Sequence, residues 1–159
     1  MIFLGIDPSL NSTGYGIIKK DGSRLHYVSS GIIKLKVGGG QEEFHEKLLT
    51  ISNKLVEIIL EFSPKKASIE ETFINSNAQS SLKLSVVRGA ILLTLMQYKM
   101  EISEFSPNFI KKTVVGNGKA EKSQVAFMVP KLLTNFPKDK VFLSEDETDA
   151  LATAIALAI

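Results

Sequence analysis

Four acidic residues stand at places in the sequence where a carboxylate is costly unless a cation needs it. Asp7 ends the apolar run 2–6 in GIDPS, and Glu70 follows a second short apolar run in SIEETF. Asp146 and Asp149 lie three residues apart in EDETDALA, so on a helix they share one face. Acidic side chains are rarely buried unless they are paired or coordinate a cation. The simplest such cation is a hard divalent metal ion.

The fold could bring these four acids together. If the strands that carry Asp7 and Glu70 are parallel neighbours, their carboxyl ends meet where open α/β sheets place their sites. The last helix, packed across the sheet, would deliver Asp146 and Asp149 to the same point. Four carboxylates within about 4–6 Å would raise one another's pKa values, and two Mg²⁺ ions roughly 3.5–4 Å apart would reverse that cost. Oxygen ligands without Cys or His favour Mg²⁺ or Mn²⁺ over Zn²⁺, which predicts metal-assisted hydrolysis of a phosphodiester.

Each acid taken alone has an ordinary explanation as well. Helix starts often carry Asp and Glu because the helix dipole favours them there, which would account for Asp146 and Asp149. An Asp before Pro can form a turn, as Asp7 could, and Glu70 could face solvent beside Glu71. The combination of four such acids, two near the ends of predicted strands and two near the start of a predicted helix, points to chemistry.

The hydrophobic pattern predicts the strands and helices that must hold these acids. Residues 2–7 form an apolar run typical of a central strand covered on both faces. Two runs rich in Ile, Tyr and Val flank Asp21-Gly22, a hairpin signal, so the chain should open with three antiparallel strands. Apolar spacing and breaker residues then predict a helix over 41–62, a strand over 65–72, a helix over 77–98 and a strand over 101–105.

The last third of the chain should be helical. Ser106-Pro107 marks the start of a short helix, and a second helix over 121–135 should be kinked or split by Pro130. Ser144 and Glu147 match a capping box, so Ser144 should start the final helix. The whole order predicts an α/β fold with a mixed five-stranded sheet, an antiparallel meander plus two parallel strands, flanked by helices on both faces.

Basic and aromatic residues near the predicted site favour a nucleic-acid substrate. Phe73 directly follows the acidic strand and could stack on a base, although a Phe more commonly packs under its own loop. Lysines around the Gly116–Gly118 loop suit phosphate contacts that weaken steeply with salt, although lysines are also common on solvated faces. These lysines are Lys111, Lys112, Lys119 and Lys122.

Composition limits the class of protein. A chain of 159 residues with 44% hydrophobic and 23% charged residues suits one globular domain with a proper core. The absence of cysteine excludes disulfides and thiolate metal sites and allows a cytoplasmic location. The N-terminal stretch reads as a strand and not as a signal peptide, and no apolar run is long enough to cross a bilayer, so no membrane partner is expected.

Four stretches of the sequence resemble the RuvC-type Holliday-junction resolvases. They are LGIDPSLNSTGYGII, IEETFINSNAQSSLKLSVVRGA, KKTVVGNGKAEKSQV and DETDALATAIA, in the family's order and spacing along essentially the whole chain. The resemblance implies a single ribonuclease-H-like nuclease domain over residues 1–159 that acts as a homodimer. It also implies cleavage of four-way DNA junctions with two Mg²⁺ (or Mn²⁺) ions per active site, by paired symmetric nicks during recombination and repair. The implied partner is the RuvA–RuvB branch-migration complex, in the cytoplasm.

The same resemblance implies roles for single residues. Phe73 would be the aromatic residue that helps to distort the junction. Two departures from the family's usual pattern, Ser9 after GIDP and Pro130 inside a helix, leave every candidate ligand in place. The implied metal ligands are Asp7, Glu70, Asp146 and Asp149, and the implied active-site lysines are Lys111 and Lys122.

Three other functions remain open from the sequence. One is a ribonuclease-H-like nuclease of the YqgF type acting on structured RNA, although such relatives look shorter and lack the KKTVVGNGKAEKSQV segment. Another is a sugar-kinase or actin-like ATPase, whose first phosphate loop also begins with a strand and GID, but DPSLNS lacks its glycine and threonine pattern. The last is a junction-binding module without catalysis, because a fold does not fix an activity.

Overall fold

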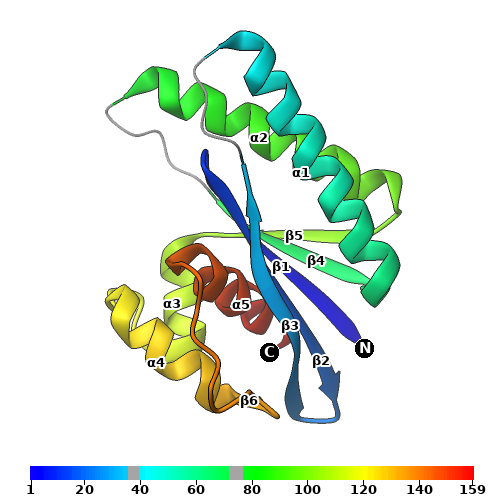
Figure 1. Cartoon of the computed structure of the whole chain (residues 1–159). Coiled ribbons are helices and arrows are strands. Elements are labelled where there is room, and N and C mark those ends of the chain that lie inside the picture. Colours follow the sequence, from blue (N-terminus) through cyan, green and yellow to red (C-terminus); the bar gives the residue numbers. More distant parts are fainter. Residues whose placement is uncertain (36–39, 72–76) are drawn as a thin grey trace.

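The computed structural model of the chain describes residues 1–35, 40–71 and 77–159. Within these ranges a six-stranded mixed sheet has the order β5-β4-β1-β2-β3-β6, with five helices packed on it (Figure 1). The strands are β1 (Ile2–Pro8), β2 (Ser12–Asp21), β3 (Arg24–Lys34), β4 (Lys66–Glu70), β5 (Glu101–Phe105) and β6 (Leu133–Thr134). The helices are α1 (Gln41–Phe62), α2 (Ala78–Gln97), α3 (Pro107–Val115), α4 (Lys122–Leu132) and α5 (Glu145–Ala158).

The predicted meander and parallel strands are confirmed. Strands β1, β2 and β3 are antiparallel, and the hairpin between β2 and β3 turns at Gly22, whose φ of +57° suits glycine. Strand β4 runs parallel to β1 on its other side, and β5 runs parallel to β4. The carboxyl ends of β1 and β4 therefore lie side by side, which is where Asp7 and Glu70 stand.

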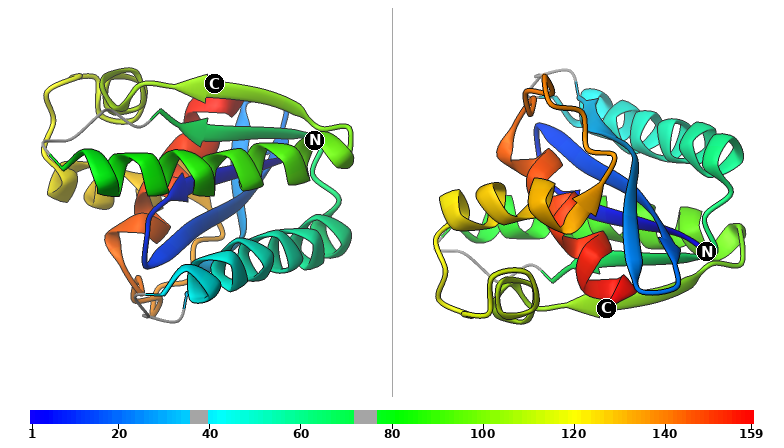
Figure 2. Two further views of the ribbon diagram at one scale, coloured as in Figure 1. Left: turned by 90° about the horizontal axis from the view of Figure 1, so that it is seen from above. Right: turned by 90° about the horizontal axis from the view of Figure 1, so that it is seen from below.

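Helices cover both faces of the sheet, and each face has its own apolar core. Helices α1 and α2 lie on one face, while α3, α4 and α5 lie on the other (Figure 2). The first core contains Leu4, Ile6 and Ile69 from the central strands, and the second contains Phe3 from β1 and Leu151 and Ile155 from α5. Side chains alternate between the faces of a strand, so Leu4 and Ile6 point to α1 and α2, whereas Phe3 and Asp7 point to α5.

The sheet has one more strand than predicted, because α4 ends earlier than predicted and frees residues to pair with β3. Pro130 sits inside α4 and cannot donate a backbone hydrogen bond, and the helix ends at Leu132 and not at residue 135. Leu133 and Thr134 instead pair with β3 as the short edge strand β6. The hydroxyl of Thr134 also lies 2.6 Å from Nδ1 of His26 on β3.

A helix that crosses a bilayer needs about 20 consecutive, predominantly apolar residues. None of the helices in the described ranges combines the length and apolar character that a bilayer crossing needs. The longest, α1, carries acidic and basic residues along its length and buries one side, formed by Ile51, Leu55, Ile58 and Ile59.

Candidate active site

Asp7 and Glu70 are brought together by the register of two parallel strands. The last residue pair between β1 and β4 joins Ile6 to Ile69, and Asp7 and Glu70 are the next residue on each strand. Both side chains point to the α5 face, as Ser68 does, whose hydroxyl donates to the carbonyl oxygen of Thr153 at 2.9 Å. The strand pairing thus places the first two predicted ligands on one face at one end of the sheet.

Glycines in β1 and β2 allow α5 to lie directly on the backbone of the sheet. A Cβ atom at Gly14 would come within 1.9 Å of the carbonyl oxygen of Asp146, and one at Gly5 within 2.0 Å of that of Ala150. A Cβ at Gly16 would come within 2.8 Å of the Cα of Leu151. Because glycine has no side chain, the helix can approach to backbone contact. This close packing carries the first turn of α5, with its acids, to the end of β1.

The two aspartates of α5 are held by different partners. Asp146 accepts a short hydrogen bond from the hydroxyl of Ser12 at the start of β2. Asp149 lies one turn further along α5, where its carboxylate is 3.3 Å from Nζ of Lys122 and its side chain is 17% exposed. All four predicted acids therefore lie at the same end of the sheet, where α5 begins.

Burial and nearby negative charge raise the pKa values of Asp7, Glu70 and Asp149. Burial, followed by the charges of the other three acids, raises the pKa of Asp7 to about 8 against the opposing charge of Lys122. Burial, followed by the charge of Asp149, raises the pKa of Glu70 to about 7, although Lys122 and Lys111 oppose that shift. Burial also raises the pKa of Asp149, against the opposing effect of Lys122. Such shifts mark a site where negative charge is unbalanced.

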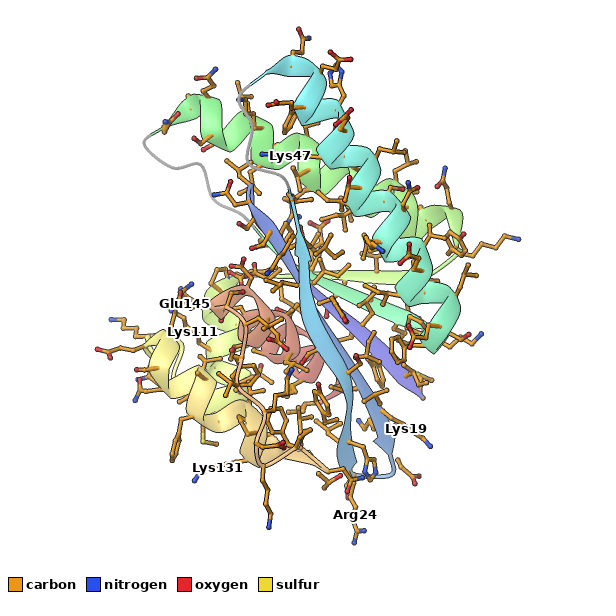
Figure 3. All side chains as sticks on the ribbon, in the orientation of Figure 1. Lys19, Arg24, Lys47, Lys111, Lys131 and Glu145 are labelled. Atoms are coloured by element: carbon orange, nitrogen blue, oxygen red, sulfur yellow. The ribbon has the colours of Figure 1, made fainter. Side chains whose placement is uncertain are left out.

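The predicted lysines divide into two groups. Lys122, at the first position of α4, lies 2.9 Å from Glu145, and its pKa is raised because its carboxylate partners outweigh its partial burial. Lys111 on α3 is close enough to act on the charge of Glu70, and Figure 3 labels it with Glu145 on the side where α5 begins. Lys112 and Lys119 are exposed. Phe73 lies outside the residues that the structure describes.

The donor set fits a hard divalent cation. Its candidate ligands are carboxylate oxygens, with burial and mutual repulsion raising the pKa values of Asp7, Glu70 and Asp149. A bound cation would relieve that repulsion. Within the described ranges, no three acidic or histidine side chains lie close enough together to form a ready-made metal site. The four acids are therefore neighbours, but their carboxylates lie further apart than the ligands of one bound metal ion would.

One acid next to the site was misread from the sequence. Glu147 was expected to complete a capping box with Ser144, but no side-chain cap bond forms at Ser144, and the buried Ser144 hydroxyl has no partner in the described part of the chain. The carboxylate of Glu147 is fully buried and accepts from the backbone N–H of Leu143 and the hydroxyl of Ser30, each at 2.7 Å. It also forms an ion pair with Lys140. The capping-box prediction is correct only in placing Ser144 at the start of α5.

Sequence comparison establishes the family. The family model described as crossover junction endodeoxyribonuclease RuvC matches residues 3–157. The chain belongs to the RuvC family. A RuvC of Rickettsia felis is 45% identical over 154 residues, which cover 97% of this chain and 95% of that protein. A RuvC of Rickettsia prowazekii is 42% identical over the same length, covering 97% and 94% of the two chains.

Solved structures agree with this RuvC assignment. Thermus thermophilus RuvC in complex with a Holliday junction substrate has a TM-score of 0.85 and 25% identity, covering 99% of this chain and 93% of that one. The yeast mitochondrial Holliday junction resolvase Ydc2 has a TM-score of 0.70 at 14% identity, covering 97% and 76%, and shows likeness of fold alone. The predicted ribonuclease-H-like fold is confirmed, with six strands in place of five.

Proposed function

We propose that this protein is a structure-selective endodeoxyribonuclease that resolves four-way DNA junctions by metal-dependent hydrolysis. Membership of the RuvC family supports the reaction, and the T. thermophilus relative was solved with such a junction. The observation that carries the proposal is the meeting of Asp7, Glu70 and the two aspartates of α5 at one end of the sheet, where the pKa values of Asp7 and Glu70 are raised. Paired symmetric nicks, as in recombination and repair, are the outcome that we infer for a two-site enzyme.

The four carboxylates are the residues that would hold the metal ions. Asp7 and Glu70 come from adjacent parallel strands, while Asp146 and Asp149 come from a helix packed on the same sheet, so the ligands approach from two sides. When bound, two Mg²⁺ ions (or Mn²⁺) would supply activation of the attacking water and stabilisation of the leaving 3′-oxygen. Metal binding would also favour the ionised form of the carboxylates, because the cations would offset the repulsion between them.

The lysines around the site have separate proposed tasks. Lys122 keeps its positive charge beside Asp149 and is exposed on its other side, so it can approach the phosphate that is cleaved. Lys111 is placed close enough to Glu70 to balance its charge. Lys112 and Lys119 are exposed and would contact phosphates further along the DNA. Phe73 keeps the role that the family resemblance implies, stacking on or distorting the junction.

A homodimer is supported by the outer side of α2. An apolar stripe there, defined as Leu82, Val86, Gly89, Leu93 and Met96, repeats at alternating steps of four and three residues. The four side chains of this stripe are 48–68% exposed, and nothing lies within 4 Å of a Cβ built at Gly89. Such a spacing is that of a helix seam, and glycine allows two helices to approach closely.

The two-fold symmetry of the proposed dimer matches the symmetry of its proposed substrate. Two identical subunits related by a two-fold axis present two identical active sites. A four-way junction also has two-fold symmetry, so the two sites would address opposing strands and give paired nicks. The RuvA–RuvB complex as a partner and a cytoplasmic location remain expectations from the family resemblance.

The decisive experiment compares the wild-type protein with Asp7→Asn on a synthetic four-way junction in a Mg²⁺ titration. We expect the wild type to produce paired nicked duplexes, and Asp7→Asn to lose cleavage while binding the junction with similar affinity. Asp21→Asn, which changes an exposed aspartate in the β2–β3 hairpin, is the matched control and should cleave normally. Cleavage by Asp7→Asn would remove Asp7 from the ligand set. Cleavage of structured RNA in place of junction DNA would overturn the proposed substrate.

A further inference from the structure

Arg88 on α2 reaches the edge of the candidate active site from the opposite face of the sheet. Its guanidinium donates one short hydrogen bond to the backbone carbonyl oxygen of Glu70 and another to the carboxylate of Glu104 on β5. The Arg88 side chain is 12% exposed. One side chain therefore joins α2 to the carboxyl ends of β4 and β5.

The hydrogen bond from Arg88 holds one side of the peptide group between Glu70 and Glu71, whose other side is already bound. The carbonyl of Glu70 and the N–H of Glu71 belong to the same planar peptide unit. Arg88 holds its carbonyl, and the N–H of Glu71 donates to the carbonyl oxygen of Phe105 at 2.9 Å. With both ends of the unit bound, rotation about the Cα–C bond of Glu70 is restricted. The direction in which the Glu70 side chain leaves the backbone is restricted with it.

We propose that Arg88 is a positioning residue that directs the carboxylate of Glu70 toward Asp7. This inference rests on the proposed function, because it assigns a task within the same site. Glu70 is the last residue of β4, and strand ends are held by fewer ladder bonds than strand centres. An added bond from a largely buried arginine replaces the missing constraint. Arg88 contacts the backbone of Glu70, so its effect on the reaction is indirect and passes through the orientation of the Glu70 side chain.

The chemistry of arginine suits this task better than that of lysine. The guanidinium is planar and presents its donors in a fixed fork, so a bond to one acceptor orients the bond to the other. The ion pair with Glu104 holds the guanidinium plane while the second nitrogen holds the Glu70 carbonyl. A lysine ammonium is a point charge on a flexible stem and would reach only one acceptor well.

The test uses Arg88→Met and Arg88→Lys, with Arg24→Met as the matched control. Arg24 is exposed in the β2–β3 hairpin, and Figure 3 labels it at the hairpin end, far from Lys111. We expect Arg88→Met to slow single-turnover junction cleavage about 10- to 100-fold, because small displacements of a catalytic group have effects of that size. Junction affinity should stay unchanged, Arg88→Lys should recover only part of the rate, and Arg24→Met should match the wild type.

Two readouts that do not depend on cleavage separate positioning from a general loss of structure. Hydrogen exchange of the Glu71 amide should become faster in Arg88→Met, while exchange of amides in the β1–β2 ladder stays unchanged. Affinity for Mn²⁺ alone, measured by calorimetry, should fall. If exchange rises throughout the sheet, or if Glu71 exchange and the cleavage rate are both unchanged, the positioning role is wrong.

A second variant keeps the inference testable if Arg88→Met does not fold. Glu104→Gln leaves the bond to the Glu70 carbonyl in place but removes the ion pair that orients the guanidinium. It should change Glu71 exchange and cleavage in the same direction and by a smaller factor, and wild-type behaviour in both would count against the proposal. If the wild type cuts no junctions, the proposed function fails, whereas the exchange and Mn²⁺ measurements still decide the role of Arg88.

Discussion

Nζ of Lys140 lies 2.6 Å from Oε1 of Glu147, whose side chain has no exposed surface. This buried ion pair joins the segment before α5 to its first turn, between the candidate ligands Asp146 and Asp149. Hydrogen bonds from Ser30 on β3 and from the N–H of Leu143 also reach the Glu147 carboxylate. The start of α5 is thus fixed to the edge of the sheet by an acid outside the predicted ligand set.

We predict that Lys140→Met destabilises the protein by about 3–5 kcal/mol, because it leaves a buried carboxylate without its cation. Lys140→Met with Glu147→Gln should recover part of this loss, since no buried charge then remains. Urea unfolding at pH 7 measures both. The lysine and two further donors lower the pKa of Glu147 against its burial, so the contribution of the pair is lost as the pH falls below the ordinary value for Glu. Equal stability of Lys140→Met and the wild type would show that the ion pair contributes nothing.

Gly14→Ala should damage the active site without touching an acid. The new Cβ would overlap the carbonyl oxygen of Asp146, so α5 must move away from β2. We expect a loss of at least about 1–3 kcal/mol in stability, as for other overpacked interiors. A displacement of about 1 Å at the ligands should slow junction cleavage about 100-fold. Gly40→Ala is the control, because nothing lies near its Cβ position, and it should keep full activity.

The metal-free protein should lose stability as the pH rises from about 4 to about 8. Over that range the unfolded chain ionises Asp7 and Glu70, whereas burial and neighbouring charges raise their folded pKa values to about 8 and about 7. The folded state then binds more protons than the unfolded state, and its stability declines. Thermal unfolding in a chelator measures this decline, which Asp7→Asn should reduce and Mg²⁺ should oppose most at pH 8. A melting temperature that rises over this range would contradict the assignment.

Lys122→Ala should reduce the cleavage rate more than it reduces junction affinity. Its ammonium group lies beside Asp149, so its loss removes positive charge at the reacting phosphate as well as one phosphate contact. Lys119→Ala removes an exposed charge away from the acids and should weaken binding with little effect on the rate of the bound complex. For each variant the slope of log affinity against log salt should fall by about one. Unchanged rate and slope in Lys122→Ala would exclude both roles.

Leu93→Glu should convert the proposed dimer into a folded monomer. Leu93 is 59% exposed at the apolar stripe of α2, so a carboxylate there is harmless to the single chain and repels its copy across a two-fold axis. Sedimentation gives the mass, and circular dichroism gives the helix content. Leu60→Glu, at an equally exposed leucine on α1, should leave the mass unchanged. A monomeric wild type, or a dimeric Leu93→Glu, would move the interface elsewhere or remove it.

The elements that carry the site could be predicted because their signals are local. Apolar runs and breakers marked the strands of Asp7 and Glu70. The start of the short helix α3 was predicted from Ser106-Pro107, whose serine caps it. Spacing alone placed Asp146 and Asp149 on one helical face. The meeting of Asp7 with Glu70 depends on the parallel register of β1 and β4. The meeting of the two aspartates with Asp7 depends on the close packing of α5 on the glycines of β1 and β2.

The features that escaped prediction depend on contacts distant in sequence. Glu147 satisfied a local capping pattern, but Ser30 and Lys140 compete for its carboxylate, and these partners become visible only in the fold. Strand β6 has two residues and no propensity signal, and it exists because β3 offers an open edge. Arg88 lies on an apolar helix, where nothing in the sequence indicates its reach to Glu70.

The backbone contact between α5 and the glycines of β1 and β2 divides the candidate site into two parts that are held in different ways. Because no side chain separates the helix from the sheet, the backbone positions of Asp146 and Asp149 can shift only together with α5. Glu70 belongs to the other part, at the end of a strand whose orientation is set by hydrogen bonds. A single side chain, Arg88, can be changed to loosen the Glu70 end, whereas the α5 end is held by backbone contacts, so engineering of the site's activity should begin on the Glu70 side.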